Sequence, residues 1–321
     1  RFMARLLGYF IRKEGQKQVN VLVATSGDTG SAVANGFLGV EGIHVYVLYP
    51  KGKVSEIQEK QFTTLGQNIT ALEVDGTFDD CQALVKNAFM DAELNAHMKL
   101  TSANSINVAR FLPQAFYYFY AYCLWKKQTG MADPVVVVPS GNYGNLAAGM
   151  LAKRMGLPIK GFVAASNAND VVPEYLMTGD YKPRASVRTV ANAMDVGAPS
   201  NFERMLWLCN DSYEQMADEI RGYSCSDEQI LAAIKDIYDQ YNYISDPHSA
   251  VGYLATVCYG NPGFWLSTAH AAKFCEITER AMSVTPALPS GLALAMGKER
   301  VFTRISSEAE DLVKFLLNFN N

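Results

Sequence analysis

The chain has 321 residues, of which 49% are hydrophobic and 19% are charged, a composition typical of a folded protein large enough for two domains. Its formal net charge of −4 argues against the basic surface that neutralises phosphates in a nucleic-acid groove, so we expect a small-molecule ligand and no nucleic acid. The six cysteines are scattered without CxxC spacing, which indicates reduced thiols and no disulfide framework or metal site.

Neither a membrane span nor a secretory signal is predicted. The longest apolar stretch, 111–125, contains Pro113 and Gln114 and falls short of the ~20 apolar residues that cross a bilayer. The first residues lead into an amphipathic stretch without a small-residue cleavage site. We therefore expect a cytoplasmic protein. Because the chain does not begin with methionine, we also expect it to start inside a longer polypeptide.

Between residues 19 and 138, short β-branched runs alternate with helical periodicity, as a parallel sheet with crossover helices requires. The predicted strands are 19–24, 45–49 and 69–74, and the predicted helices are 30–38, 54–65 and 78–91. An aromatic-rich helix is expected at 111–127. The four valines 135–138 then indicate a buried strand.

A second alternation begins there, so the fold class is α/β with open twisted sheets. We expect a helix at 146–155 and a strand at 161–165. The pattern loosens over 170–223, where loops and short helices are predicted. The last predicted helix is 226–241 and the last predicted strand is 264–267.

A glycine-rich turn, Ser140-Gly141-Asn142-Tyr143-Gly144-Asn145, comes after the four-valine strand and opens a helix. Backbone N–H groups and the positive end of the helix dipole converge there, which favours an anion. Glycine allows close approach of the backbone, and the side chains of Ser140, Asn142 and Asn145 can add hydrogen bonds. The alternative is a turn that needs glycine only for its geometry.

A second turn, Thr25-Ser26-Gly27-Asp28-Thr29-Gly30, repeats this arrangement at the end of the first strand. Two anion sites suit a phosphorylated cofactor together with a carboxylate or phosphorylated substrate. Neither turn contains GxGxxG or the lysine ending of a P-loop, which argues against a nicotinamide dehydrogenase or a nucleotide hydrolase.

The third segment is Ser102-Ala103-Asn104-Ser105-Ile106-Asn107-Val108-Ala109-Arg110. The guanidinium of Arg110 is a planar fork suited to bidentate phosphate recognition, and Asn104 and Ser105 can supply neutral donors beside it. The alternative is a helix N-cap before a solvated charge.

Together the three segments resemble the threonine synthase family, which comprises fold-type II pyridoxal-phosphate enzymes with a tryptophan synthase beta-like fold. The resemblance runs from Arg1 to about Phe274 and includes the stretches 192–196 and 268–274. Each motif alone is short, so the resemblance depends on their joint order and spacing. The family pattern has proline where Ala271 stands.

This resemblance implies pyridoxal 5'-phosphate as the cofactor and O-phospho-L-homoserine as the substrate, which reacts with water to give L-threonine and phosphate. The implied cofactor-binding residues are Ser140, Gly141, Asn142, Tyr143, Asn145 and Thr268. Thr268 would face the pyridine nitrogen, where a hydroxyl in place of a carboxylate would leave that nitrogen less strongly protonated. The implied substrate-binding residues are Ser26, Thr29, Asn104, Ser105 and Arg110, the last three on the substrate phosphate.

The family's Schiff-base lysine lies a few residues before a Gly-Gly-Arg-Phe-Met-Ala segment, and this chain starts at Arg1-Phe2-Met3-Ala4. We therefore expect the catalytic lysine just before Arg1, outside the chain. Two alternatives stay open. One is another fold-type II lyase, such as a threonine or serine dehydratase or a phospholyase. The other is a non-catalytic homologue that binds pyridoxal phosphate or phosphate, if no lysine precedes Arg1.

For the domains, we expect a smaller, mobile α/β domain at 16–107 on the substrate side, inserted into a larger cofactor-binding domain formed by 1–15 and 108–321. The cofactor would lie in the cleft between them, with the smaller domain free to close over the substrate. A monomer or a homodimer is expected. The roles of His248 and His270 stay open.

Overall fold

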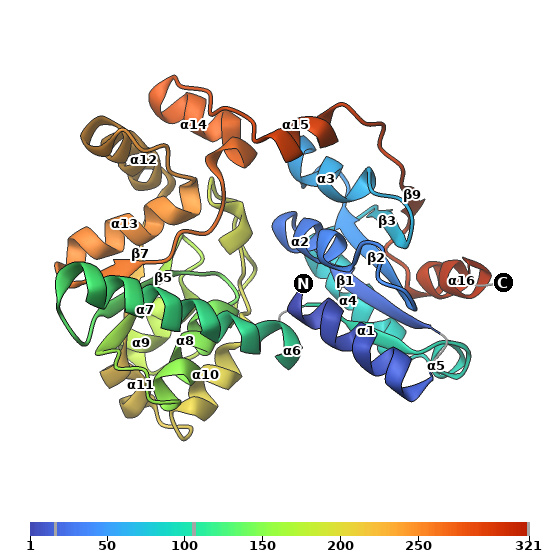
Figure 1. Cartoon of the computed structure of the whole chain (residues 1–321), viewed down its shortest axis with the longest axis horizontal. Coiled ribbons are helices and arrows are strands. Elements are labelled where there is room, and N and C mark those ends of the chain that lie inside the picture. The colour runs from blue at the N-terminus through green and yellow to red at the C-terminus, as the bar shows by residue number, and fades with distance from the viewer. Residues whose placement is uncertain (16–17, 105–106, 320–321) are drawn as a thin grey trace. The chain divides into compact units, whose positions relative to one another are not determined.

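The computed structural model describes residues 1–15, 18–104 and 107–319. Its contacts divide the chain into two units, which we call unit 1 (Arg1–Arg110 with Leu288–Asn321) and unit 2 (Phe111–Ala287). Each unit contains its own parallel sheet with helices packed around it (Figure 1). The α/β fold class is therefore confirmed.

Unit 1 contains a five-stranded parallel sheet in the order β4-β1-β2-β3-β9. Its strands are β1 Val19–Ala24, β2 Ile43–Pro50, β3 Ile69–Val74, β4 Leu100–Ser102 and β9 Thr303–Ile305. Its helices are α1 Phe2–Glu14, α2 Asp28–Phe37, α3 Glu56–Thr63, α4 Phe78–Met90, α5 Ala92–His97, α15 Ser290–Met296 and α16 Ala309–Phe319, and α6 Val108–Phe111 spans the division. Every residue of β1 is buried, because side chains cover both faces of the sheet.

Unit 2 contains a four-stranded parallel sheet in the order β7-β6-β5-β8. Its strands are β5 Val135–Pro139, β6 Gly161–Ser166, β7 Ile220–Ser224 and β8 Gly263–Trp265. Its helices are α7 Ala115–Thr129, α8 Gly144–Arg154, α9 Val171–Thr178, α10 Phe202–Leu208, α11 Tyr213–Glu219, α12 Asp227–Tyr241, α13 Pro247–Tyr259 and α14 Cys275–Met282, with 3-10 turns η1 Leu112–Gln114, η2 Asn192–Met194 and η3 Ala271–Phe274.

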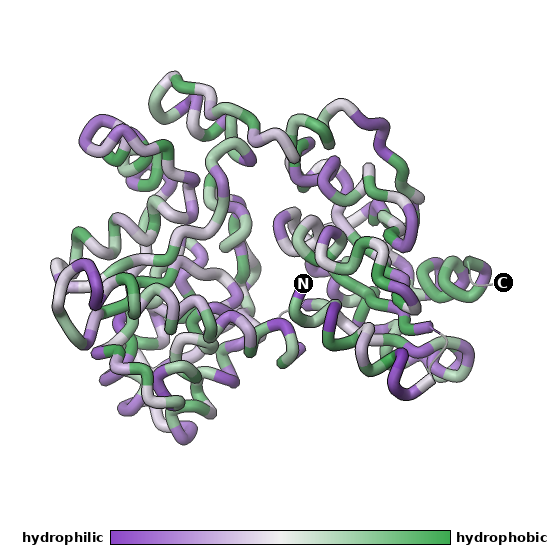
Figure 2. The backbone as a smooth tube through the Cα atoms, in the orientation of Figure 1, coloured by the Kyte–Doolittle hydropathy of each residue, from purple (hydrophilic) through white to green (hydrophobic). Residues whose placement is uncertain are grey.

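The two units differ from the expected domains at both ends of the chain. Residues 1–15 and 288–321 were expected in the larger domain, but they pack within unit 1. Helix α1 buries Ala4 and Ile11 in the same core as Phe37 of α2. Strand β9 pairs with β3, and α16 buries Leu312 and Leu316 beside that sheet. Figure 2 shows that α16 is mainly hydrophobic, which explains why it packs against the sheet.

Strands β4, β7 and β9 have no counterpart in the sequence prediction, and β7 lies in a region where only loops and short helices were expected. Each of the three stands at an edge of its sheet. An edge strand is paired on one side only and needs few buried residues, so it lacks the apolar run that reveals a central strand. Among the helices that the structure describes, none is long and apolar enough to cross a membrane.

Candidate active site

The predicted phosphate turn, residues 140–145, lies between the central strand β5 and helix α8 of unit 2. Tyr143 takes a left-handed conformation (φ 57°, ψ 18°), which turns the chain into the helix. Gly141 lies against the backbone of η2, since a Cβ added there would stand only 2.6 Å from Met194 Cα. Glycine is therefore required at position 141 by this close approach.

Two polar side chains of the turn hydrogen-bond within it, and a third bonds to Ser200. The Ser140 hydroxyl donates to Asn145 Oδ1 (2.5 Å) and accepts from the Tyr143 amide (3.0 Å). Asn145 Nδ2 donates to the carbonyl of Pro139 (3.0 Å), and Asn142 Oδ1 accepts from the amide of Ser200 (2.6 Å). These side chains were expected to bind the anion directly. In the structure they bond to the turn and to Ser200, and their direct contact with an anion stays a prediction.

The groups suited to the anion are backbone amides at the start of α8. The amide of Leu146 donates to Asn145 Oδ1 (2.9 Å), and that of Ala147 donates to the carbonyl of Tyr143 (2.9 Å). Within the described ranges, no acceptor takes a hydrogen bond from the amides of Gly144 or Asn145. Such amides at the positive end of a helix dipole bind phosphate well.

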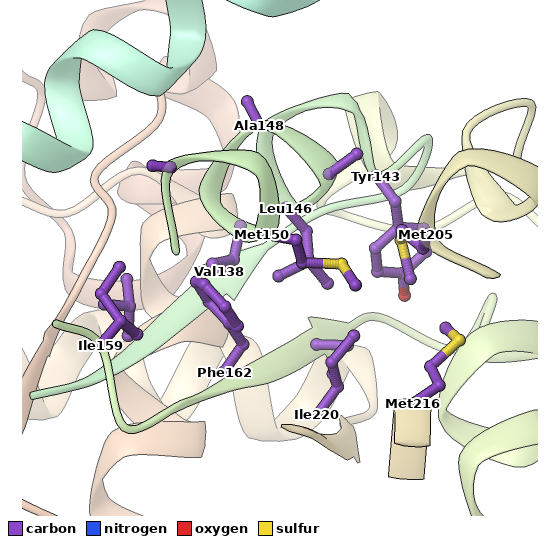
Figure 3. Close-up of a cluster of buried hydrophobic side chains, with 14 of the residues drawn as sticks. Val138, Tyr143, Leu146, Ala148, Met150, Ile159, Phe162, Met205, Met216 and Ile220 are labelled. Carbon is purple, nitrogen blue, oxygen red and sulfur yellow. The ribbon is translucent and has the colours of Figure 1, made fainter. Parts of the chain in front are cut away.

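Two buried tyrosines, Tyr143 and Tyr118, hold the turn in place through hydrogen bonds of their hydroxyls. The Tyr143 ring is buried among the core side chains drawn in Figure 3, and its hydroxyl shares a short hydrogen bond with Ser166 Oγ. The Tyr118 hydroxyl of α7 donates to the carbonyl of Asn145 (2.6 Å). Burial raises the pKa of both tyrosines, so both hydroxyls keep their hydrogens at neutral pH. The buried side chain of Tyr143 therefore helps to shape the cradle.

Thr268 lies just after β8 in the same unit and is exposed. Its hydroxyl donates to Asp246 Oδ1 (3.2 Å), and its amide donates to Ser249 Oγ (3.0 Å). Asp246 is buried at the N-cap of α13, where it also accepts from the amides of His248 (2.9 Å) and Ser249 (3.2 Å). A buried carboxylate therefore stands directly behind the predicted pyridine partner.

His248 connects this carboxylate to the segment that covers the cradle. Its Nδ1 lies 3.0 Å from Asp246 Oδ1, and its Nε2 accepts from the amide of Ala193 (3.1 Å), next to the Met194 that contacts Gly141. The residue is buried and supports the site from behind. His270 has a different role, because its Nδ1 caps η3 by accepting from the amide of Ala272 (3.1 Å).

In unit 1, the predicted substrate turn lies directly after β1. The buried Thr25 hydroxyl accepts from the amides of Gly27 (2.9 Å) and Gly30 (2.7 Å), which leaves Ser26 and Thr29 on the partly exposed side of the turn. Asn104 bonds to both backbone groups of Ala24, accepting at 3.2 Å and donating at 2.8 Å. Asn104 thus ties the segment after β4 to the end of β1.

Arg110 is half-buried and completes this group. Its Nη1 donates to the carbonyl of Ala103 (2.8 Å) and its Nη2 donates to the Thr29 hydroxyl (3.0 Å). Burial lowers the pKa of Arg110 to about 10, so the guanidinium is a cation at neutral pH. The structure therefore places Arg110 against Thr29 and against Ala103, the neighbour of Asn104. Ser105 lies outside the described residues.

Comparisons with known proteins show the family of the chain. Residues 1–261 match the family described as "Pyridoxal-phosphate dependent enzyme", and residues 249–316 match "Threonine synthase, C-terminal". The threonine synthase of Serratia marcescens is 44% identical over 320 residues, which are 99% of this chain and 73% of that protein. The chain belongs to the threonine synthase family of pyridoxal-phosphate dependent enzymes.

Solved structures of this family share the fold. The crystal structure of threonine synthase from Escherichia coli has a TM-score of 0.90 at 41% identity and covers 99% of this chain and 74% of its own. The pyridoxal-phosphate-bound threonine synthase from Brucella melitensis has a TM-score of 0.90 at 33% identity, with coverages of 98% and 73%. The similarity therefore extends past Phe274, where the sequence motifs alone had ended it.

The threonine synthase family members bind pyridoxal phosphate, and unit 2 fits such a group. The amides of Gly144 and Asn145 suit its phosphate. Gly141 has no side chain, which allows the backbone of η2 to lie directly against the turn. In addition, the buried Oδ1 of Asn192 has no hydrogen-bond partner in the described part of the chain, so a ligand donor would satisfy it. The sequence motifs did not reveal Asp246, since an aspartate before proline looks like any helix N-cap.

Proposed function

We propose that the chain converts O-phospho-L-homoserine and water to L-threonine and phosphate, with pyridoxal 5'-phosphate held in unit 2. Membership of the threonine synthase family supports the reaction. The observation that carries the choice of substrate is Arg110, a half-buried cation that is oriented by Ala103 and Thr29. A phosphorylated substrate brings the dianion that such a guanidinium recognises, whereas the substrate of a dehydratase does not.

The two units have different tasks in this proposal. The amides of Gly144 and Asn145 would bind the cofactor phosphate, and Thr268 would contact the ring nitrogen. When bound, the cofactor would supply the electron sink that stabilises carbanions while phosphate leaves Cγ and water adds at Cβ. Ser26 and Thr29 would bind the substrate, and Arg110 would hold its phosphate. Asn104 would keep the two substrate-binding segments aligned, and Ser105 stays a predicted phosphate ligand.

The test is substitution of Arg110 by alanine in the full-length gene product. A charge-assisted hydrogen bond contributes roughly 1.5–3 kcal/mol, so kcat/KM for O-phosphohomoserine should fall about 10- to 150-fold. Arg304→Ala is the matched control in the same unit, because Arg304 is exposed and pairs with Glu73 (2.8 Å) on the edge of the sheet. Unchanged turnover in Arg110→Ala would overturn the choice of substrate.

The alternatives predict other outcomes. A threonine or serine dehydratase would release a 2-oxo acid and ammonia from the unphosphorylated amino acid faster than phosphate from O-phosphohomoserine. Another phospholyase would release phosphate without forming threonine. A non-catalytic homologue would show no lysine labelled by the cofactor after borohydride reduction and peptide mass mapping of the full-length protein. One labelled lysine supports the enzyme. A cytoplasmic location, a monomeric or homodimeric state and a mobile smaller domain stay predictions.

A further inference from the structure

The Thr268 hydroxyl carries a single hydrogen, and in unit 2 that hydrogen is directed to Asp246 Oδ1 (3.2 Å). We propose that Asp246 is a positioning residue that fixes the polarity of Thr268, so that the hydroxyl oxygen presents only lone pairs to the ring nitrogen and favours its protonated form. This inference rests on the proposed function, which gives Thr268 its contact with the cofactor ring.

Such a role requires that Asp246 be ionised. Burial alone would raise the pKa of this carboxyl, but the hydrogen bonds that it accepts from His248 and Ser249 outweigh burial and hold the pKa below its usual value. The carboxylate accepts from two amides, from His248 Nδ1 and from the Ser249 hydroxyl, so donors surround it. An ionised carboxylate can only accept, and the Thr268 hydroxyl must therefore donate.

The partner of His248 fixes the direction of the same network. The amide of Ala193 can only donate, so His248 Nε2 must accept and the ring hydrogen lies on Nδ1, directed to Asp246 (3.0 Å). Every hydrogen bond in this group thus points toward one carboxylate. Because the Thr268 hydroxyl donates its hydrogen to Asp246, its oxygen can only accept a hydrogen bond from the ring nitrogen. A protonated ring nitrogen can donate that bond, whereas an unprotonated nitrogen would place its lone pair against a lone pair of the oxygen.

This network revises the expectation that a hydroxyl at position 268 leaves the ring nitrogen weakly protonated. In enzymes where a carboxylate contacts the pyridinium directly, its charge favours the protonated ring. Here the carboxylate stands one hydroxyl behind, and it polarises that hydroxyl by a charge-assisted hydrogen bond. Asp246 and Thr268 together act as an extended carboxylate.

The experiment is a pH titration of the 15N NMR signal of ring-labelled pyridoxal phosphate bound to the full-length protein without substrate. Asp246→Asn keeps an N-cap side chain of the same size but removes the charge. The difference between a charged and a neutral acceptor predicts that the pKa of the ring nitrogen falls by about one unit. In a Thr268→Val background, Asp246→Asn should cause no further change, because the hydroxyl that couples them is absent.

A second variant covers the case in which Asp246→Asn does not fold. Ser249→Ala removes one donor from the carboxylate and leaves the charge in place, so the pKa of the ring nitrogen should rise. An unchanged 15N titration in both variants, or in whichever of them folds, would reduce Asp246 to a helix cap and overturn the proposal. Because the signal is recorded without substrate, that outcome is independent of whether the wild-type protein turns over O-phosphohomoserine, which tests the proposed function.

Discussion

Substitution of Gly141 by alanine should disturb the cradle through one backbone contact. The new Cβ would lie 2.6 Å from Met194 Cα and 2.7 Å from its carbonyl oxygen, whereas ordinary contacts begin at 3.4 Å. Two backbone segments must therefore separate by about 0.8 Å, the difference between 3.4 and 2.6 Å. Met194 cannot yield freely, because its amide donates to Ala191 (3.0 Å) and the neighbouring amide of Ala193 is held by His248 (3.1 Å).

Overpacking of this kind costs roughly 1–3 kcal/mol. If the turn stays in place, the free energy of unfolding of the cofactor-free protein falls by that amount. If the turn relaxes, the amides of Gly144 and Asn145 shift and the affinity for pyridoxal phosphate falls instead. Urea denaturation and fluorescence titration with the cofactor measure the two quantities on the same sample.

The control is Gly291→Ala in α15, where nothing lies within 4 Å of the added Cβ. There alanine should be neutral or stabilise the helix by up to about 1 kcal/mol. The structural role assigned to Gly141 would be refuted if Gly141→Ala matched this control in both unfolding free energy and cofactor affinity. That result would mean that η2 moves aside without a free-energy cost and that its contact with Gly141 does not shape the turn.

Buried groups give three further predictions. Burial raises the pKa of Asp195 to about 6. As pH rises from about 4 through 6, ionisation of Asp195 should therefore lower the unfolding free energy of the wild type by roughly 1–3 kcal/mol relative to Asp195→Asn. A difference between the two proteins that does not change with pH in denaturation experiments contradicts this prediction. Tyr118→Phe removes the hydrogen bond to the Asn145 carbonyl. The free energy of unfolding should fall by about 1 kcal/mol in denaturation, and cofactor affinity should fall several-fold in titration. Equal values for the wild type and the variant would exclude the anchoring role. A thiol reagent should label the exposed cysteines at once and the buried cysteines only when the protein unfolds, because burial raises the pKa of the buried thiols to about 11 or 12. Absorbance gives the rate of labelling, and mass mapping identifies the labelled residues. The fast thiols are expected to be Cys123 and Cys258, and the protected ones Cys81, Cys209 and Cys225.

The sequence predicted the central strands well because their signal is local. The valines of β5 and the β-branched run of β1 are buried on both faces, so they appear as continuous apolar stretches. Strand β9 has no such signal, since two of its three residues are exposed and its partner β3 lies more than 200 positions earlier in the chain. The same long-range pairing explains why the sequence did not indicate that the C-terminal segment packs with unit 1.

The motifs also located the turns of the site, but they could not say which atoms face a ligand. Ser140, Asn142 and Asn145 have the side chains of anion ligands, and the structure shows that these side chains also bond to the turn and to Ser200. Only three-dimensional structure shows how the bonding capacity of a side chain has been used. Arg110 is oriented by Ala103 and Thr29, and its contact with a substrate phosphate stays a prediction.

Thr268 extends the same limit from binding to chemistry. A hydroxyl can donate or accept, so its residue type alone leaves the protonation of a facing ring nitrogen undetermined. The choice is made by Asp246, which is 22 positions away and is held ionised by His248 and Ser249. The electron-withdrawing strength of a cofactor in this unit would therefore depend on a buried carboxylate that never touches it. Substitutions around Asp246 should tune the ring nitrogen while the residues in contact with the cofactor stay the same.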